Sequence, residues 1–357
     1  MATKLPVRQC LGIDVSKDDL ALSFMNLEQD NRTRILTSKK LSNNKTGFAK
    51  LSILLKKFRA AQDIPFCVVM EATGVYYEDL AYYLHEQEVK VCVVLPNKSK
   101  AFAKSLDYKS KTDSIDAKIL AQMGLERNLS PWKPLSDKML IVKRLCRERV
   151  ALQNHKTSVK NQLHAMNHAH KSNTEAVKRA KTLVKFLEKQ IKEVEQQIKA
   201  EVANDQALKL KVDNITTIKG VGFITAVTVI SETNGFSLIK NKAQLVSYAG
   251  YDVVENSSGS SVKGKTRISK KGNSFLRRAM HFPALTSVKY VPELKAIYDR
   301  VFFNTRIKMK AVVAVQRKIL VLIYTLFKYD SVYDPNYLEK AQQRSVSKNK
   351  AGHGVPA

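Results

Sequence analysis

Four carboxylates in the first third of the chain follow a pattern that could hold metal ions. Asp113 and Asp116 stand three residues apart at the start of a helical pattern, so they share one face of its first turn. Asp14 lies inside the first strand pattern, where a carboxylate is costly unless it is paired or bound to a metal. Glu71 ends an apolar strand pattern, and ligands gather at strand ends in α/β layers. Four convergent oxygen donors suit Mg²⁺ or Mn²⁺, which serve phosphoryl transfer.

Each of these acids also has an ordinary structural explanation when it is taken alone. Asp113 could cap its helix, Asp116 could oppose the positive end of the helix dipole, and Glu71 could be a strand-end charge. The metal-site hypothesis therefore depends on the elements that carry the four side chains.

The elements of the first 130 residues predict a mixed α/β layer. Three strand patterns joined by short polar turns indicate an antiparallel meander: 7–15, 19–27 and 33–41. Helices and strands then alternate: helix 46–58, strand 65–73, helix 77–88, strand 90–97 and the helix entered at Asp113. Because a first and a central strand can be neighbours in such a sheet, a helix that crosses their ends would bring the four acids together.

The charge balance predicts a polyanionic partner. The chain of 357 residues has 61 lysines and arginines against 32 aspartates and glutamates, a formal net charge of +29. The excess lies mostly after residue 130: residues 131–212 carry 18 basic and 8 acidic groups, and residues 213–357 carry 23 and 9. An excess of this size favours nucleic acid as the partner.

Other compositional features predict a cytoplasmic, nucleoid-associated protein without a membrane partner. No apolar run is long enough to span a bilayer, and the N-terminus lacks the apolar core of a signal peptide. The four cysteines show no CxxC spacing, so we interpret them as reduced residues rather than zinc ligands or disulfides.

The middle of the chain is predicted to be helical. Residues 135–210 contain neither glycine nor proline, and Leu187, Ile191, Val194 and Ile198 form a seam with spacings of four, three and four. This pattern indicates a long, coiled-coil-like helical hairpin that dimerises or acts as a spacer. A single amphipathic helix packed on its own domain is the alternative.

Several motifs resemble one family in their order and spacing. They are LGIDVSK, VVMEATGVYYEDLAYYL, KTDSIDAKILA, IKGVGFITA, LVSYAG and the run from SSG to RISKKGNSFLRRA. Over about residues 8–285 the chain resembles the IS-one-ten family of insertion-sequence transposases, which includes the Piv-type DNA invertases. The resemblance implies an N-terminal RuvC-like domain of ribonuclease H fold with an Asp-Glu-Asp-Asp tetrad at Asp14, Glu71, Asp113 and Asp116.

The same resemblance implies a nucleophilic serine, which falls on Ser258 in the segment NSSGSS. A serine hydroxyl needs an exposed, flexible loop to reach a phosphodiester, and the neighbouring glycine provides flexibility. Ser257 and Ser260 are rival candidates, because several serines stand where one is needed. A plain solvated loop is the alternative for the whole segment.

Two segments are predicted to contact nucleic acid. A turn with Gly220 and Gly222 resembles a helix-hairpin-helix element, although helix-capping turns often have the same glycines. The second segment is a basic run, for which a solvated charged face is the alternative: Lys263, Lys265, Arg267, Lys270, Lys271, Arg277 and Arg278.

The sequence thus predicts four parts: a RuvC-like catalytic domain at 1–130, a helical segment at 131–212, a mainly helical transposase domain at 213–335 and a disordered tail at 336–357. The expected function is DNA transposition or recombination. The resemblance implies a phosphoserine intermediate, a structured guide RNA that pairs with double-stranded donor and target DNA, and a homo-dimer or larger homo-oligomer. A DNA invertase of the same architecture, a junction-resolving nuclease that uses water and a non-catalytic nucleic-acid binder are the alternatives.

Overall fold

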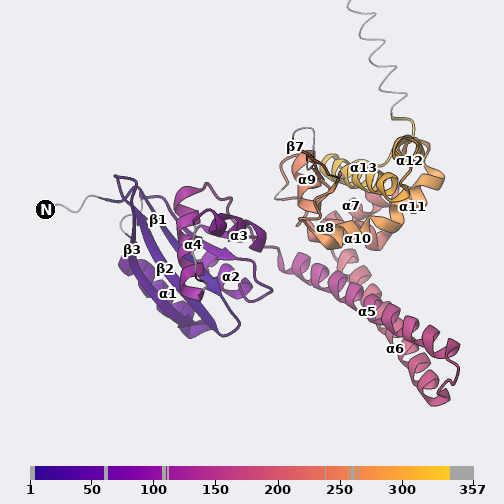
Figure 1. Ribbon diagram of the computed structural model, residues 1–357, viewed down its shortest axis with the longest axis horizontal. Helices are drawn as coiled ribbons and strands as arrows, with labels where there is room; N and C mark the ends of the chain where they lie inside the picture. Colours follow the sequence, from indigo (N-terminus) through magenta and orange to yellow (C-terminus); the bar gives the residue numbers. More distant parts are fainter. Residues whose placement is uncertain are drawn as a thin grey trace, which may run out of the picture. The chain divides into compact units, whose positions relative to one another are not determined.

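The chain folds into two compact units, Met1–Pro134 and Leu135–Ala357 (Figure 1). The computed structural model describes the following residues: 5–59, 63–106, 110, 112–237, 239–255, 257–258, 262–264 and 266–337. Residues 338–357, most of the tail predicted to be disordered, lie outside the described residues. No helix in the described ranges is long and apolar enough to cross a bilayer.

The first unit is built on a five-stranded sheet with the strand order β3-β2-β1-β4-β5. The strands are β1 (Arg8–Val15), β2 (Asp19–Leu27), β3 (Thr33–Ser42), β4 (Phe66–Glu71) and β5 (Val91–Val94). The first three pair antiparallel, whereas β4 runs parallel to both β1 and β5. The predicted meander and mixed sheet are therefore confirmed, with β1 at the centre of the sheet.

Helices cover both faces of this sheet. They are α1 (Lys45–Phe58), α2 (Glu78–Glu86), α3 (Pro96–Lys104) and α4 (Asp113–Glu126). Side chains alternate along β1, so Leu11 and Ile13 pack with α1 and α2 on one face, whereas Cys10 packs with α3 and α4 on the other. The four cysteines are buried and free, as expected of reduced core residues.

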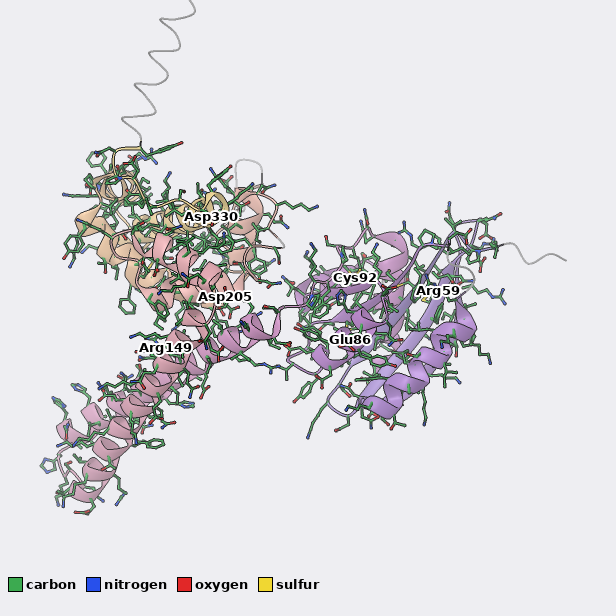
Figure 2. All side chains as sticks on the ribbon, turned by 180° about the vertical axis from the view of Figure 1, so that it is seen from behind. Arg59, Glu86, Cys92, Arg149, Asp205 and Asp330 are labelled. Carbon is green, nitrogen blue, oxygen red and sulfur yellow. The ribbon has the colours of Figure 1, made fainter. Side chains whose placement is uncertain are left out.

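The second unit begins with a helical hairpin of α5 (Asp137–His168) and α6 (Thr174–Ala203), which lie side by side (Figure 1). Ser136 and Asn173 cap the two helices with side-chain oxygens. The four seam residues predicted from the sequence are buried on α6, and Arg149 of α5 donates to Glu195 of α6 at 2.6 Å. Other side chains of both helices stand out around the hairpin (Figure 2).

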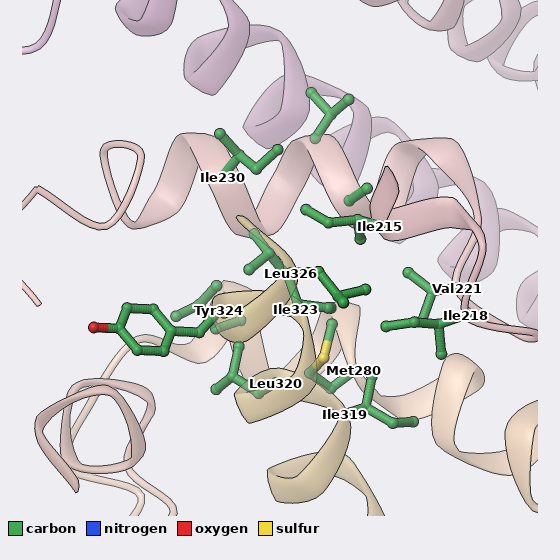
Figure 3. Close-up of a cluster of buried hydrophobic side chains, with 14 of the residues drawn as sticks. Ile215, Ile218, Val221, Ile230, Met280, Ile319, Leu320, Ile323, Tyr324 and Leu326 are labelled. Carbon is green, nitrogen blue, oxygen red and sulfur yellow. The ribbon is translucent and has the colours of Figure 1, made fainter. Parts of the chain in front are cut away.

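Among the described residues of the second unit, seven further helices surround one apolar core. They are α7 (Gln206–Thr216), α8 (Phe223–Glu232), α9 (Lys242–Ala249), α10 (Ser274–Ala279), α11 (His281–Tyr290), α12 (Pro292–Thr305) and α13 (Lys308–Tyr329). Helix α13 contributes Ile319, Leu320 and Ile323 to this core, where they gather with Ile215 and Met280 (Figure 3). Four two-residue strands lie between α9 and α10: β6 (Val253–Val254), β7 (Ser257–Ser258), β8 (Val262–Lys263) and β9 (Arg267–Ile268).

Candidate active site and nucleic-acid interface

The carboxyl ends of β1 and β4 place Asp14 next to Glu71. Ile13 and Met70 are the last register partners of these two parallel strands, and the two acids follow them directly. Alternation along β1 puts Asp14 on the same face as Gly12, which is the face that α4 covers. Two of the four predicted carboxylates therefore lie on neighbouring strand ends beneath one helix.

The packing of α4 on β1 fixes the direction of this helix. A Cβ atom on Gly12 would lie 2.0 Å from the carbonyl oxygen of Ala117, so the backbones of strand and helix touch there. A Cβ atom on Gly124 would lie 2.3 Å from the sulfur of Cys10, further back along the strand. The helix therefore runs antiparallel to β1, and its first turn lies toward the end of the strand that carries Asp14.

The first turn of α4 carries the other two carboxylates, Asp113 and Asp116. Thr112 caps the helix, because its Oγ1 accepts a hydrogen bond from the backbone N–H three residues later at 3.3 Å. Lys40 of β3 forms a hydrogen bond with Asp19, whose carboxylate oxygen lies 2.8 Å from Lys40 Nζ. This bond and the charge of Asp19 raise the pKa of Lys40, and the charge of Asp113 raises it further. Asp113 thus lies within electrostatic range of the sheet.

The side chains of the four acids do not meet in a single coordination sphere in this conformation. Across the described ranges, no group of three or more His, Cys, Asp or Glu side chains is close enough to bind a metal ion. The backbone brings Asp14 and Glu71 together and directs the first turn of α4 toward them. Convergent carboxylates repel each other and require a cation to offset that repulsion, so the donor chemistry fits a divalent ion.

Glu71 is oriented by two hydroxyl groups that no sequence pattern marks. Ser99 of α3, only 5% exposed, donates from Oγ to Glu71 Oε2, and Thr73 Oγ1 donates to Oε1 at 3.5 Å. Helix α3 is absent from the predicted elements because its sequence, PNKSKAFAK, has one large apolar residue, Phe102. Pro96 at its first position is the signal that could have revealed it.

Ser258 lies on a β-hairpin and not in a structureless loop. Strand β6 pairs with β9, and β7 pairs with β8 further along the same two arms, with Ser258 opposite Val262. The four strands have two residues each, which is too short for an alternating pattern to mark them. Ser258 is five residues beyond Val253 in the chain.

Two glycines and an arginine hold the base of this hairpin. Gly250 ends α9 with a left-handed φ of 73°. A Cβ atom on Gly272 would lie 2.5 Å from the backbone nitrogen of Gly250. Arg277 Nη1 donates to the carbonyl oxygens of Ala249 at 2.8 Å and Gly272 at 3.0 Å. Arg277, predicted to contact nucleic acid, therefore forms hydrogen bonds within the protein that join the two ends of the hairpin.

The remaining basic residues of the predicted interface have different surroundings. Arg278 is exposed and donates from Nη1 to Asn154 Oδ1 of α5. Three others are exposed on and after β9: Arg267, Lys270 and Lys271. Lys263 belongs to β8, and Lys265 lies outside the described residues.

The two glycines between α7 and α8 serve different purposes. Gly220 has a φ of 102°, and a Cβ atom there would lie 2.4 Å from Ser287 Oγ of α11, so packing and backbone conformation both require glycine. Gly222 caps α8, and a Cβ atom there would meet no described atom within 4 Å. Only Gly222 leaves the open approach that a phosphate contact at the start of α8 would need.

A buried carboxylate connects α5 with the helices next to the serine hairpin. Glu232 of α8, 2% exposed, accepts hydrogen bonds from Arg147 of α5 at 2.7 and 2.9 Å and from Asn273 at 2.8 Å. Burial acts to raise the pKa of Glu232, but the hydrogen bonds from Arg147 and Asn273 outweigh it and lower the pKa below its usual value. The sequence gives no sign of this ion pair, because 85 residues separate its members.

Two sequence profiles of transposases match the chain. One, described as a transposase, matches residues 11–167, and the other, described as a transposase of the IS116/IS110/IS902 family, matches residues 212–299. The chain belongs to the IS116/IS110/IS902 family of transposases. This confirms the family resemblance, and membership makes the protein a DNA phosphoryl-transfer enzyme.

Curated relatives of this transposase extend the match over most of its length. The pilin gene-inverting protein of Moraxella lacunata is 26% identical over 325 residues, which cover 91% of this chain and 97% of the relative. The protein of the same description from Moraxella bovis matches over the same shares of both chains. An uncharacterized 43.6 kDa protein of insertion element IS110 from Streptomyces coelicolor is 26% identical over 34% of this chain and 29% of its own length.

The mixed five-stranded sheet and its helices agree with the RuvC-like fold expected for the first unit of this transposase, and a DEDD domain of this type implies a divalent metal ion. Among solved structures, Thermus thermophilus RuvC in complex with a Holliday junction substrate is 15% identical, with a TM-score of 0.27, over 35% of this chain and 99% of RuvC. A TM-score of this size supports no conclusion about function.

Proposed function

We propose that this transposase cuts and rejoins DNA at the ends of an insertion sequence and at its target. The observation that carries the proposal is the placement of Asp14 and Glu71 on neighbouring strand ends, toward which α4 directs Asp113 and Asp116. We assign these four carboxylates to a site for Mg²⁺ or Mn²⁺. When bound, the metal would polarise the scissile phosphate and stabilise charge on the attacking and leaving oxygens.

Ser258 is the proposed nucleophile. Its Oγ forms a bond to the DNA phosphorus while the bond from that phosphorus to the leaving deoxyribose oxygen breaks. The proton lost by Oγ balances the proton gained by the leaving oxygen. One phosphate ester replaces another, so rejoining by the reverse reaction needs no nucleoside triphosphate. The pairing of β7 with β8 supports this role, because it carries Ser258 on a strand of the segment between α9 and α10 and not on a helix of the core.

The exposed basic residues are the proposed phosphate contacts. Arg267, Lys270, Lys271 and Arg278 belong to residues 213–357, whose 23 basic and 9 acidic groups leave a net charge of +14. A structured guide RNA that pairs with donor and target DNA is the second proposed polyanion, and the same charge supports it. Lys263 and Lys265 keep the contacts predicted for them as proposals.

The proposed working form is a homo-dimer or larger homo-oligomer. Asp116 and Ser258 are 142 residues apart (258 minus 116) and belong to different compact units. In the proposed assembly the serine of one subunit meets the carboxylates of another, and the helical hairpin of α5 and α6 contributes to the association.

A site-specific DNA invertase is the second candidate function. The observation that favours it is the similarity to a pilin gene-inverting protein over 97% of the length of that relative. Both candidates share the proposed chemistry and differ in the DNA arrangement that they recombine. A plasmid with inverted element ends would be inverted by an invertase, whereas a transposase would move the element to a separate target.

The covalent intermediate gives the most direct test of the proposal. The protein is incubated with DNA that carries the element ends, with Mg²⁺, and the mixture is denatured before electrophoresis. We expect DNA that migrates with covalently attached protein, and we expect a chelator to abolish it. Cleavage without an adduct would instead indicate a nuclease that uses water, and intact DNA would indicate a non-catalytic binder.

A further inference from the structure

An exposed aromatic side chain lies on the helical surface that continues from the basic helix α10. Met280, the residue between α10 and α11, keeps helical backbone angles (φ −81°, ψ −10°), so helical spacing continues across it. The exposed residues that follow this spacing form a strip: Arg278, Phe282, Leu285 and Lys289. Phe282 is 75% exposed and Leu285 is 41% exposed.

The opposite face of these helices fixes the strip toward solvent. Leu276, Met280, Ala284 and Ser287 are buried in the core of the second unit, and Ser287 also donates to the carbonyl oxygen of Lys219 at 2.7 Å. The helices cannot rotate to bury Phe282 without exposing this inner face. The fold therefore presents the phenylalanine ring outward.

The charged residues near the strip favour an anionic partner. Residues 256–292 contain eight lysines and arginines and no aspartate or glutamate. A single exposed aromatic residue is common on protein surfaces, but Phe282 lies between Arg278 and Lys289 in a stretch of the chain whose charged residues are all basic. A second copy of this surface would be repelled, and lysine is depleted at the centre of protein interfaces. An unpaired nucleotide combines a flat apolar base with an anionic phosphate, which matches both features.

We propose that Phe282 stacks on an unpaired base of a single-stranded nucleic acid, with Arg278 and Lys289 on the flanking phosphates. The proposal rests on the nucleic-acid chemistry proposed for this transposase and adds a residue and a strand type to it. Bases inside a duplex already stack on each other, so duplex DNA does not engage Phe282. Single-stranded DNA and the unpaired regions of a folded RNA offer the same chemistry.

Tryptophan fluorescence reports this stacking directly. The chain has one tryptophan, Trp132, whose ring packs edge-on against Tyr82 at 5.1 Å, and Trp132→Phe keeps a ring there. In that background Phe282→Trp places the only indole on the strip. We expect oligothymidylate or oligouridylate to quench its fluorescence and a hairpin duplex to leave it unchanged. The matched control is Val332→Trp, because Val332 is 58% exposed near Asp330 and Asp334.

Affinity measurements separate stacking from other apolar contacts. We expect Phe282→Ala and Phe282→Leu to weaken oligothymidylate binding about fivefold to a hundredfold, and Phe282→Tyr to preserve it. The salt dependence of binding should stay the same in all three variants, because no phosphate contact is removed. Phe282 is mostly exposed, so the variants should unfold at the wild-type temperature.

Three results would overturn the stacking proposal. They are wild-type affinity in Phe282→Leu, unquenched fluorescence of the introduced indole at saturation, and a changed oligomeric state of Phe282→Ala with normal nucleic-acid affinity. If the wild-type protein cleaves DNA while the Phe282 variants bind it normally, only the stacking role fails. If the wild-type protein binds no nucleic acid, the proposed function fails together with it.

Discussion

At the scale of the residue, the carboxylates at the ends of β1 and α4 should control cleavage without controlling the fold. Asp14→Asn and Asp113→Asn each remove one charge of the proposed metal site, so we expect strand cleavage to fall by roughly a hundredfold or more. Circular dichroism should be unchanged. Asp30→Asn is the matched control, since Asp30 is an exposed turn residue paired with Arg32. Full cleavage by Asp14→Asn, or in the presence of chelator, would exclude the tetrad.

Ser99 should affect the metal through Glu71. Ser99→Ala removes the hydroxyl that donates to the carboxylate, so Glu71 can rotate away from the proposed site. Loss of such a supporting hydrogen bond lowers metal affinity about tenfold to a hundredfold, so more Mg²⁺ should be needed for half-maximal binding and cleavage. Calorimetric titration with Mn²⁺ gives a readout apart from activity. Ser105→Ala is the control, because Ser105 caps the C-terminus of α3 and its hydroxyl donates to the carbonyl oxygen of Phe102. Equal metal affinity in both variants would contradict this role.

At the scale of the element, a substitution in the serine hairpin should abolish DNA cleavage without weakening DNA binding. Ser258→Ala removes one oxygen near the end of a short strand, so we expect it to lose DNA cleavage and the covalent adduct while it keeps DNA affinity. Ser257→Ala and Ser260→Ala should keep both activities. Mass spectrometry of the adduct peptide identifies the attached residue. Attachment at Ser257 or Ser260 would show that the nucleophile was assigned to the wrong serine.

The base of the hairpin predicts that two adjacent arginines differ in their effects. Arg278→Ala should reduce the slope of log affinity against log salt by about one, because an exposed phosphate contact is lost. Arg277→Ala should leave that slope unchanged and destabilise the second unit by about 2 kcal/mol, because it removes the hydrogen bonds to Ala249 and Gly272. Salt titrations and urea unfolding of the two variants measure both effects. If the salt-dependence slope fell equally in Arg277→Ala and Arg278→Ala, Arg277 would also contact nucleic acid.

The sequence predicts elements well where apolar residues alternate or recur at helical spacing. The strands around Asp14 and Glu71 and the helix entered at Asp113 have such patterns, so their order and the position of the candidate site follow from the sequence. Helix α3 and the serine hairpin lack them, because α3 has a single large apolar residue and because serine, glycine and lysine dominate the hairpin segment. Ser99 and the pairing of Ser258 with Val262 are consequently visible only in the structure.

At the scale of the whole molecule, the ion pair of Glu232 with Arg147 should make the stability of the second unit depend on pH. The pKa of Glu232 is lowered in the folded state, so its stabilising effect is present above the unfolded value of 4.5 and is lost as pH falls through the folded value. Glu232→Gln leaves Arg147 without its charged partner and should cost about 3 kcal/mol at pH 7. Urea unfolding at pH 7 and at successively lower pH values, through the folded-state pKa of Glu232, measures this. The wild type and the variant should converge at acid pH, and a constant difference would contradict the assignment.

The same ion pair illustrates which parts of the molecule a sequence does not predict. Arg147 and Glu232 belong to different helices, and each is an ordinary charged residue of its own segment. Only the packing of α5 against α8 makes one of them buried and the other its partner. The predicted division at residue 212 likewise stays a prediction, and the observed compact unit includes both the helical hairpin and the C-terminal helices.

The contact between Gly12 and Ala117 determines how closely α4 holds its two carboxylates to the strand ends of the proposed metal centre. A methyl group on Gly12 would begin 2.0 Å from the Ala117 oxygen, whereas ordinary contact starts near 3.4 Å, so α4 would have to lift by more than 1 Å. Displacements of about 1 Å can cost two orders of magnitude in rate. All four carboxylates would still be present in such a protein. A design that places the tetrad on another sheet must therefore also place a glycine at the position equivalent to Gly12.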